Sequence, residues 1–253
     1  MSEGHRPDSV YIGGGTPTVC TPRELEGLIR AVRDTFDTQL EEITVEANPD
    51  DLTPGYLEAL RRRCDETGAL LIFDEIQTGL GRTGTLYFFQ QYGVVPDILC
   101  TAKAFGGGMP LGAFIAPNRI MSSLKTNPVL GHITTFGGHP VCCAAGLAAL
   151  EFILSEGLME QADAKGAQYE RRLAGHPAVR EIRRTGLLMG VEFGDPALTQ
   201  RIVLRAVERG LMTEWFLFRD TAMRIAPPLT ITPAEIDESC DILLDVLREV
   251  TGS

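Results

Sequence analysis

The sequence predicts an α/β fold that has a mostly parallel sheet and, after it, a small α/β domain at the C-terminus. Residues 69–73 form a continuous apolar run that has the length and composition of a strand buried on both faces, as the strands of parallel sheets are. Residues 95–100 are interpreted as another buried strand. Helical patterns lie between predicted strands, which favours parallel pairing through crossover connections. From about residue 158 the pattern changes, so we expect a separate domain from there to the C-terminus.

The first predicted domain, residues 1–54, has the pattern strand, helix, strand. Its first strand is a β-prone run at residues 9–12, which ends in glycines. Residues 21–24, Thr-Pro-Arg-Glu, form a typical capped helix start, and apolar residues then recur at helical spacing. Residues 42–46 alternate like a second strand, and Pro54 opens another helix. We therefore expect a β–α–β unit here.

The second predicted domain, residues 55–157, contains both buried strands, and a polar residue follows each of them. Asp74 follows the first strand, and Lys103 follows the second, just before the glycines at residues 106–108. A helix of small residues is expected from about Pro140 onward. Because α/β folds bind ligands at the carboxyl ends of their strands, we expect the functional site in this domain.

The third predicted domain, residues 158–253, alternates helices with strands. The expected elements are a polar helix at 160–173, a strand at 187–193, a helix at 198–209, a strand around 223–226 and a capped helix from 232. We expect them to form the small α/β domain.

Composition limits the classes of function. Of the 253 residues 44% are hydrophobic, which is enough to bury a sizeable core. The formal net charge of −11 argues against binding to nucleic acid or to a membrane surface, because both need basic patches. No apolar run approaches the roughly 20 residues that span a bilayer, and the N-terminus lacks the apolar core of a signal peptide. We therefore expect a cytoplasmic protein.

The six cysteines have no spacing that is typical of a zinc site or an iron–sulfur cluster. We expect no metal site, and we interpret the cysteines as small apolar residues in a reducing compartment.

Two side chains at the expected strand ends could carry chemistry. Lys103 lies between a buried strand and a glycine-rich turn, where backbone can approach a ligand closely. Asp74 ends a neighbouring strand. An amine and a carboxylate in these places suit a pyridoxal phosphate (PLP) site, in which lysine holds the cofactor and moves a proton, and aspartate keeps the ring nitrogen protonated. A purely structural Asp74–Lys103 ion pair explains the same residues equally well.

Five segments of the chain carry a more specific pattern. They are LLIFDEIQTGLGRTG at 70–84, TAKAFGGGMPLGA at 101–113, TFGGHP at 135–140, GLLMGVE at 186–192 and RIAPPL at 224–229. In sequence and in order they resemble segments of the class III aminotransferases, the acetylornithine and ornithine aminotransferase group. The resemblance implies a partial fold-type-I PLP-transferase large domain, with a mostly parallel sheet, followed by a small C-terminal domain.

The resemblance also implies how the cofactor is held. Lys103 would be the Schiff-base lysine and would shuttle the proton, and Asp74 would pair with the pyridine nitrogen. Ile76 would pack on one face of the ring, and Gln77 would reach the ring hydroxyl. The alternative for Ile76 is an ordinary core position.

Two further residues follow from the same resemblance. Thr135 would bind the cofactor phosphate of the other subunit, so a homodimer is expected. Arg224 would hold the substrate α-carboxylate, which suits a planar guanidinium. The alternatives are a helix-capping role for Thr135 and a surface ion pair for Arg224.

Upstream of about residue 55 this resemblance stops, and the family's phosphate-binding helix start and ring-stacking aromatic have no counterpart. Residues 8–53 resemble instead a fragment of the radical-SAM coproporphyrinogen oxidase-like proteins, in the GGGTP turn at 13–17 and the strand before Glu46. That family's CxxxCxxC motif is absent from the sequence, so we expect no radical chemistry. The alternative is a βαβ fragment that completes the sheet. A chimaeric or truncated gene, joined between residues 48 and 61, would explain both resemblances.

The expected function is PLP-dependent transamination between an amino acid or terminal amine and a 2-oxo acid. Two alternatives remain: a non-catalytic aminotransferase remnant, and an S-adenosylmethionine-binding radical-SAM fragment. A cofactor absorbance band that disappears in Lys103→Ala would separate the first expectation from the remnant.

Overall fold

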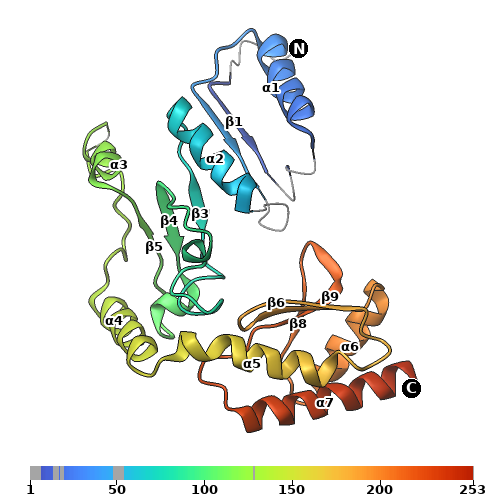
Figure 1. The fold of residues 1–253 in the computed structure, drawn as a ribbon. Coiled ribbons are helices and arrows are strands. Elements are labelled where there is room, and N and C mark those ends of the chain that lie inside the picture. Colours follow the sequence, from blue (N-terminus) through green and yellow to red (C-terminus); the bar gives the residue numbers. More distant parts are fainter. Residues whose placement is uncertain (1–6, 14–16, 18–19, 48–53, 128, 253) are drawn as a thin grey trace. The chain divides into compact units, whose positions relative to one another are not determined.

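The structure is a computed structural model of the chain. The residues that it describes are 7–13, 17, 20–47, 54–127 and 129–252. The chain folds into two compact units, Met1–Arg62 and Arg63–Ser253 (Figure 1). The expected boundary at residues 54 and 55 falls at the start of α2 (Pro54–Thr67), the helix within which the two units divide.

The first unit contains the expected β–α–β arrangement of β1 (Ser9–Ile12), α1 (Pro22–Phe36) and β2 (Glu42–Val45). β1 and β2 pair in parallel, as a crossover through α1 requires. The predicted cap of α1 is confirmed: the Thr21 hydroxyl accepts from the backbone N–H of Glu24 at 3.3 Å, and the Glu24 carboxylate accepts from the N–H of Thr21 at 2.8 Å.

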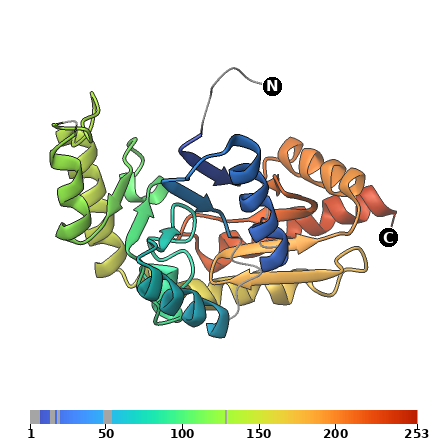
Figure 2. The same ribbon diagram turned by 90° about the horizontal axis from the view of Figure 1, so that it is seen from above.

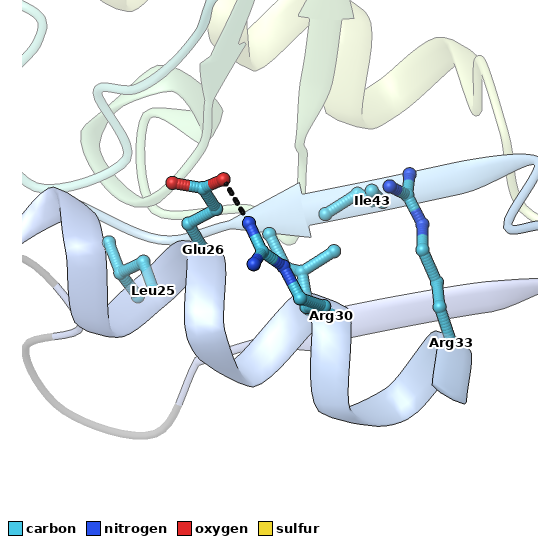
Figure 3. A pocket seen from close by; sticks show the side chains of 6 residues that line it. Leu25, Glu26, Arg30, Arg33 and Ile43 are labelled. Atoms are coloured by element: carbon cyan, nitrogen blue, oxygen red, sulfur yellow. Dashed lines mark hydrogen bonds and ion pairs between the residues drawn. The ribbon is translucent and has the colours of Figure 1, made fainter. Parts of the chain in front are cut away.

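A hollow of about 500 Å³ lies between α1 and β2 in this unit (Figure 3). Its lining is half apolar and half charged, and consists of Leu25, Glu26, Ile29, Arg30, Arg33 and Ile43. Arg30 and Glu26 form an ion pair at 2.7 Å along α1. None of the predicted site residues lines this hollow. Residues 14–16 of the expected glycine turn and residues 48–53 of the following loop lie outside the described residues.

The second unit begins with a three-stranded sheet of β3 (Ile72–Asp74), β4 (Ile98–Thr101) and β5 (Ala113–Ile115), in the order β3–β4–β5. β3 and β4 are parallel as expected, whereas β5 runs antiparallel to β4, so the sheet is mixed. The prediction that β3 is buried on both faces is wrong. Ile72 is 51% exposed, because the described residues leave one face of this strand uncovered.

Short helices and one long helix complete this part of the second unit. They are η3 (Phe88–Gln91), η4 (Lys103–Gly106), α3 (Asn118–Met121), η5 (Ser122–Lys125) and α4 (Pro140–Ser155). α4 packs against η4 through two glycines. A Cβ atom at Gly107 would lie 2.6 Å from the carbonyl oxygen of Ala145, and one at Gly146 would lie 2.8 Å from that of Phe105. Glycine therefore permits a close approach that fixes the turn carrying Lys103.

The C-terminal part of the second unit is an antiparallel sheet in the order β6–β7–β9–β8, with helices packed on one face (Figures 1 and 2). The elements are α5 (Leu158–Leu173), β6 (Glu181–Thr185), β7 (Leu188–Glu192), α6 (Pro196–Glu208), β8 (Glu214–Phe216), β9 (Arg219–Ile225) and α7 (Pro233–Thr251). Alternate residues of the two central strands, Met189 and Val191 in β7 and Met223 and Ile225 in β9, join the helices in a large core. The three expected helices and two expected strands are confirmed. The edge strands β6 and β8 were not predicted.

Candidate active site

Asp74 and Lys103 lie at the same edge of the three-stranded sheet. Asp74 is the last residue of β3 and stands opposite Cys100 in the parallel strand β4. β4 ends at Thr101, and Lys103 opens η4 two residues later. The carboxyl ends of the two strands are therefore adjacent, which is where open α/β sheets bind ligands. The structure brings together the two residues that the sequence pattern singled out first.

The Asp74 and Lys103 side chains are both exposed, and they form no ion pair with each other. One oxygen of Asp74 instead accepts a hydrogen bond from the backbone N–H of Ile76 at 3.0 Å. Lys103 has φ 50°, in the left-handed region that lysine seldom occupies, and such backbone outliers gather at functional sites. The purely structural ion pair is therefore not observed, and the lysine amine is available to a ligand.

The charge of Asp74 reaches the neighbouring strand. Burial raises the pKa of the Cys100 thiol, and the Asp74 carboxylate raises it further. The same negative charge would stabilise a cationic or protonated group at this edge of the sheet.

Glu75 fixes the segment that follows β3, a role that sequence reasoning missed. Its side chain is buried at 4% exposure. One carboxylate oxygen accepts from the N–H of Phe88 at 2.7 Å and from the Thr78 hydroxyl at 2.8 Å, and the other accepts from the N–H of Phe89 at 2.7 Å. The sequence signal was a second acidic residue directly after Asp74, but the sequence cannot tell which of two adjacent carboxylates turns inward.

The other predicted cofactor residues lie in two places. Ile76 and Gln77 are half-buried and follow Asp74 directly. Thr135 is exposed in the loop before α4, and no hydrogen bond among described residues joins it to the rest of the site. The N-cap of α4 is His139, so the alternative that Thr135 caps this helix is wrong.

Arg224 lies on β9 and points to the sheet face opposite the core, because its neighbours Met223 and Ile225 point into the core. Its guanidinium forms an ion pair with Glu214, the residue opposite it on β8. The ion-pair alternative for Arg224 is thus present in the structure. Its predicted contact with substrate stays a prediction.

Arg82 joins the segment after β3 to the C-terminal sheet, a role that no pattern in the sequence indicated. Its guanidinium donates to the carbonyl of Leu187 at 3.3 Å and to the carbonyl of Pro227. Its own carbonyl accepts from the N–H of Leu187 at 2.9 Å. Burial lowers the pKa of Arg82, and the nearby charge of Arg224 lowers it further. An arginine in a glycine-rich segment is visible in the sequence, but partners 105 and 145 residues away are not.

Comparison with known proteins gives the family. The model of the family described as Aminotransferase class-III matches residues 37–247, most of the chain. The chain belongs to this family. The match begins upstream of residue 55, so the likeness of this class III chain to its family extends further toward the N-terminus than its motifs indicated.

Curated relatives of this class III chain are aminotransferases. It is 41% identical over 232 residues to the acetylornithine aminotransferase of Caldanaerobacter subterraneus, an alignment that covers 90% of the chain and 57% of the relative. It is 45% identical over 192 residues to that of Methanosarcina acetivorans (75% and 46% covered). It is 42% identical over 204 residues to the putrescine aminotransferase of Pectobacterium atrosepticum (78% and 43% covered). The chain spans about half the length of the curated relatives it matches.

Solved structures give the same result. The ornithine aminotransferase of Toxoplasma gondii ME49 matches 92% of the chain, and 56% of its own, with a TM-score of 0.73 and 32% identity. That of Plasmodium falciparum matches 90% and 59%, with a TM-score of 0.71 and 32% identity. The expected fold-type-I architecture of this class III chain is confirmed.

Two further points concern the radical-SAM resemblance of the N-terminal residues and the question of a membrane-spanning helix. The comparisons do not support the radical-SAM resemblance of residues 8–53. Within the described residues, no single helix has the length and apolar composition needed to cross a bilayer. α4 and α5 together would meet that measure only as a pair bent by 70°.

Proposed function

We propose that this chain binds PLP and transfers an amino group between an amino acid or a terminal amine and a 2-oxo acid. Membership of the class III family supports the reaction type. The observation that carries the proposal is the placement of Lys103 and Asp74 at adjacent strand ends, where they do not neutralise each other.

The residues at this edge fit PLP. The cofactor has an aldehyde that a lysine amine can hold and a ring nitrogen that a carboxylate can keep protonated. Lys103 offers an exposed amine that makes no ion pair with a described residue. Asp74 offers a carboxylate with one oxygen already oriented by Ile76. When bound, PLP supplies a ring that accepts electrons from the carbon next to the amino group.

Four side chains of the chain would divide the work at this edge. The Lys103 amine would hold the cofactor and then move a proton at the substrate carbon, which requires a neutral fraction of the amine. Asp74 would hold a proton on the ring nitrogen. Ile76 would pack against one face of the ring and exclude water from it, and Gln77 would bind the ring hydroxyl.

The proposal includes a homodimer. Thr135 lies in an exposed loop next to Phe136, an aromatic residue that is 78% exposed, and the two suit a surface covered by a second copy. From there Thr135 would bind the phosphate of the partner's cofactor. Arg224 would bind the substrate α-carboxylate in exchange for Glu214.

Organisation and location are also part of the proposal. We retain three parts: residues 1–54, a cofactor-binding part at 55–157 and a small domain at 158–253. We also propose a cytoplasmic location, with which six free cysteine thiols agree.

Covalent attachment of the cofactor tests the proposal. PLP added to the purified chain should give a visible absorbance band, and borohydride should then lock the cofactor onto the peptide that contains Lys103. Lys103→Ala should abolish both the band and the labelled peptide. Peptide mapping by mass spectrometry identifies the site.

Lys125→Ala is the matched control, because Lys125 ends η5 outside the proposed site. It should keep the band and the labelled peptide. Label on Lys125 or Lys165, or no specific label at all, would overturn the proposal and favour a non-catalytic remnant.

A further inference from the structure

We infer that Arg82 is a positioning residue that sets the place of Arg224 relative to the cofactor edge of the sheet, and thereby selects for substrates that carry a carboxylate beside the amine. The inference rests on the proposed function. It adds a residue that touches neither cofactor nor substrate.

The hydrogen bonds of Arg82 reach both strands of the pair that carries Arg224, at the end where β7 begins and β9 ends. Leu187 directly precedes β7, and it is bonded twice: its carbonyl accepts from the Arg82 guanidinium, and its N–H donates to the Arg82 carbonyl. Pro227 follows β9 by two residues, and its carbonyl accepts from the same guanidinium. Since β7 and β9 are paired strands, one side chain fixes both.

Close packing leaves this segment little freedom to move. A Cβ atom at Gly186 would lie 2.6 Å from the carbonyl oxygen of Arg82. A Cβ atom at Gly81 would lie 3.1 Å from Leu229 and 3.2 Å from Met159. The segment that begins at Asp74 is therefore clamped to the C-terminal sheet at Arg82, and a shift at one end is transmitted to the other.

A second buried cation holds the same loop. Lys165 on α5 is 8% exposed, and its amine donates to the carbonyl of Leu229 at 2.6 Å. Arg82 and Lys165 thus fix two carbonyls of the short loop that leaves β9. Hydrogen bonds from charged donors are among the stronger ones. The planar guanidinium of Arg82 can donate to two carbonyls in a fixed geometry, which a lysine amine does not reproduce.

The charge of Arg82 has an effect of its own. Its described partners are neutral carbonyls, so its positive charge is not cancelled by an ion pair, whereas Arg224 pairs with Glu214. The two guanidiniums are close enough for Arg224 to lower the pKa of Arg82. This uncancelled charge adds to the attraction of Arg224 for a carboxylate.

The test compares two amines that differ only in the carboxylate: 2-aminopentanoate and butan-1-amine. Each is titrated into the cofactor-loaded chain, and the absorbance change gives its affinity. Arg82→Met should weaken 2-aminopentanoate on the order of 10-fold to 100-fold, as small displacements in a site do, and leave butan-1-amine unchanged. Arg82→Lys should recover part of the lost affinity for 2-aminopentanoate. Lysine keeps the positive charge but cannot donate to both carbonyls in the geometry that the guanidinium allows.

Arg172→Met is the matched control. Arg172 also ties elements of the C-terminal part together, through Asp237 at 2.7 Å and through Asp241, but it does so on the helices. Arg172→Met should lower the stability of the chain but keep its preference for 2-aminopentanoate over butan-1-amine. Equal weakening of both amines by Arg82→Met, or the same loss in Arg172→Met, would overturn the inference, as would a wild-type chain that binds the two amines equally.

Hydrogen exchange of the cofactor-free chain separates this inference from the proposed function. In Arg82→Met, amides of residues 219–229 should exchange faster than in the wild type and in Arg172→Met. If Lys103 takes no cofactor but this exchange increases, the proposed function fails while the clamp stands. If exchange there does not change, the clamp is refuted even when the cofactor binds.

Discussion

At the scale of single residues, the site depends on a buried carboxylate that has no part in the chemistry. Replacing Glu75 by Ala removes the acceptor for two backbone N–H groups and one hydroxyl. Buried donors that lose their acceptor cost about 1–3 kcal/mol, so urea denaturation should give a free energy of unfolding lower by that amount. Glu66→Ala is the control, since among the described residues Glu66 makes only an exposed ion pair, with Arg63, and it should change stability by less than about 0.5 kcal/mol. Equal losses in the two variants would contradict this role.

Glu192 gives the C-terminal sheet a dependence on acid. Burial alone would raise the pKa of this carboxyl, but hydrogen bonds from Thr221, Arg219 and the N–H of Gly194 lower it below its ordinary value. A carboxyl whose pKa is lowered in the folded state stabilises the fold above its unfolded pKa, and this contribution is lost as pH falls through the folded pKa.

The expected result is a thermal midpoint that falls on acidification below about pH 4.5, the ordinary pKa of the group. Glu192→Gln should be less stable at neutral pH and should lose less on acidification. Calorimetry between neutral and acidic pH measures both. If the thermal midpoints of the wild type and Glu192→Gln fall equally on acidification, other carboxyl groups dominate the acid dependence.

At the scale of elements, the contact of α4 with η4 requires glycine. In Gly146→Ala the new Cβ would lie 2.7 Å from Leu111 and 2.8 Å from the carbonyl of Phe105, so α4 must move away from the turn that carries Lys103. Overpacking of this kind costs about 1–3 kcal/mol, and cofactor attachment should fall with it. Gly27→Ala on α1 has no atom within 4 Å of the new Cβ, and it should stabilise its helix by about 0.5–1 kcal/mol. If Gly27→Ala is destabilised as much as Gly146→Ala, the contact of α4 with η4 has no special role in stability.

Elements with a strong local pattern could be predicted, and those set by distant partners could not. The cap of α1 at Thr21 and Glu24 involves neighbours in sequence, so it was correct. β6, with the sequence EIRRT, is an edge strand whose polar residues alternate little with apolar ones, so it was missed. The exposure of Ile72 was also missed, because an apolar run indicates a strand but not what covers it.

The site shows the same division. Asp74 and Lys103 follow strands that the pattern could place, and the structure brought them to one edge. The inward turn of Glu75 depends on Phe88 and Phe89, which lie in a later short helix. The partners of Arg82 lie in another part of the chain altogether. Sequence motifs therefore identify the residues that contact a ligand more readily than they identify the residues that hold those residues in place.

At the scale of the whole molecule, apolar side chains are buried unevenly. The C-terminal sheet and its helices bury a large contiguous core. α4, in contrast, is rich in apolar residues and yet exposes Val141, Leu147 and Phe152 by 56%, 58% and 50%. A helix that is apolar around most of its surface is normally buried. In the proposed homodimer, a second copy would cover this surface together with the loop that carries Thr135.

Self-association through α4 is the corresponding prediction for the intact chain. Sedimentation velocity should show a mass that increases with concentration, because exposed apolar area of this extent favours association. Leu147→Gln should shift the chain toward monomer. Met212→Gln is the matched control: Met212 is 94% exposed but lies beyond α6, so this variant should associate like the wild type. If both variants associate as strongly as the wild type, α4 is not the contact surface. If the wild type is monomeric at every concentration, Thr135 cannot reach a partner's cofactor, and the phosphate must be bound by other residues.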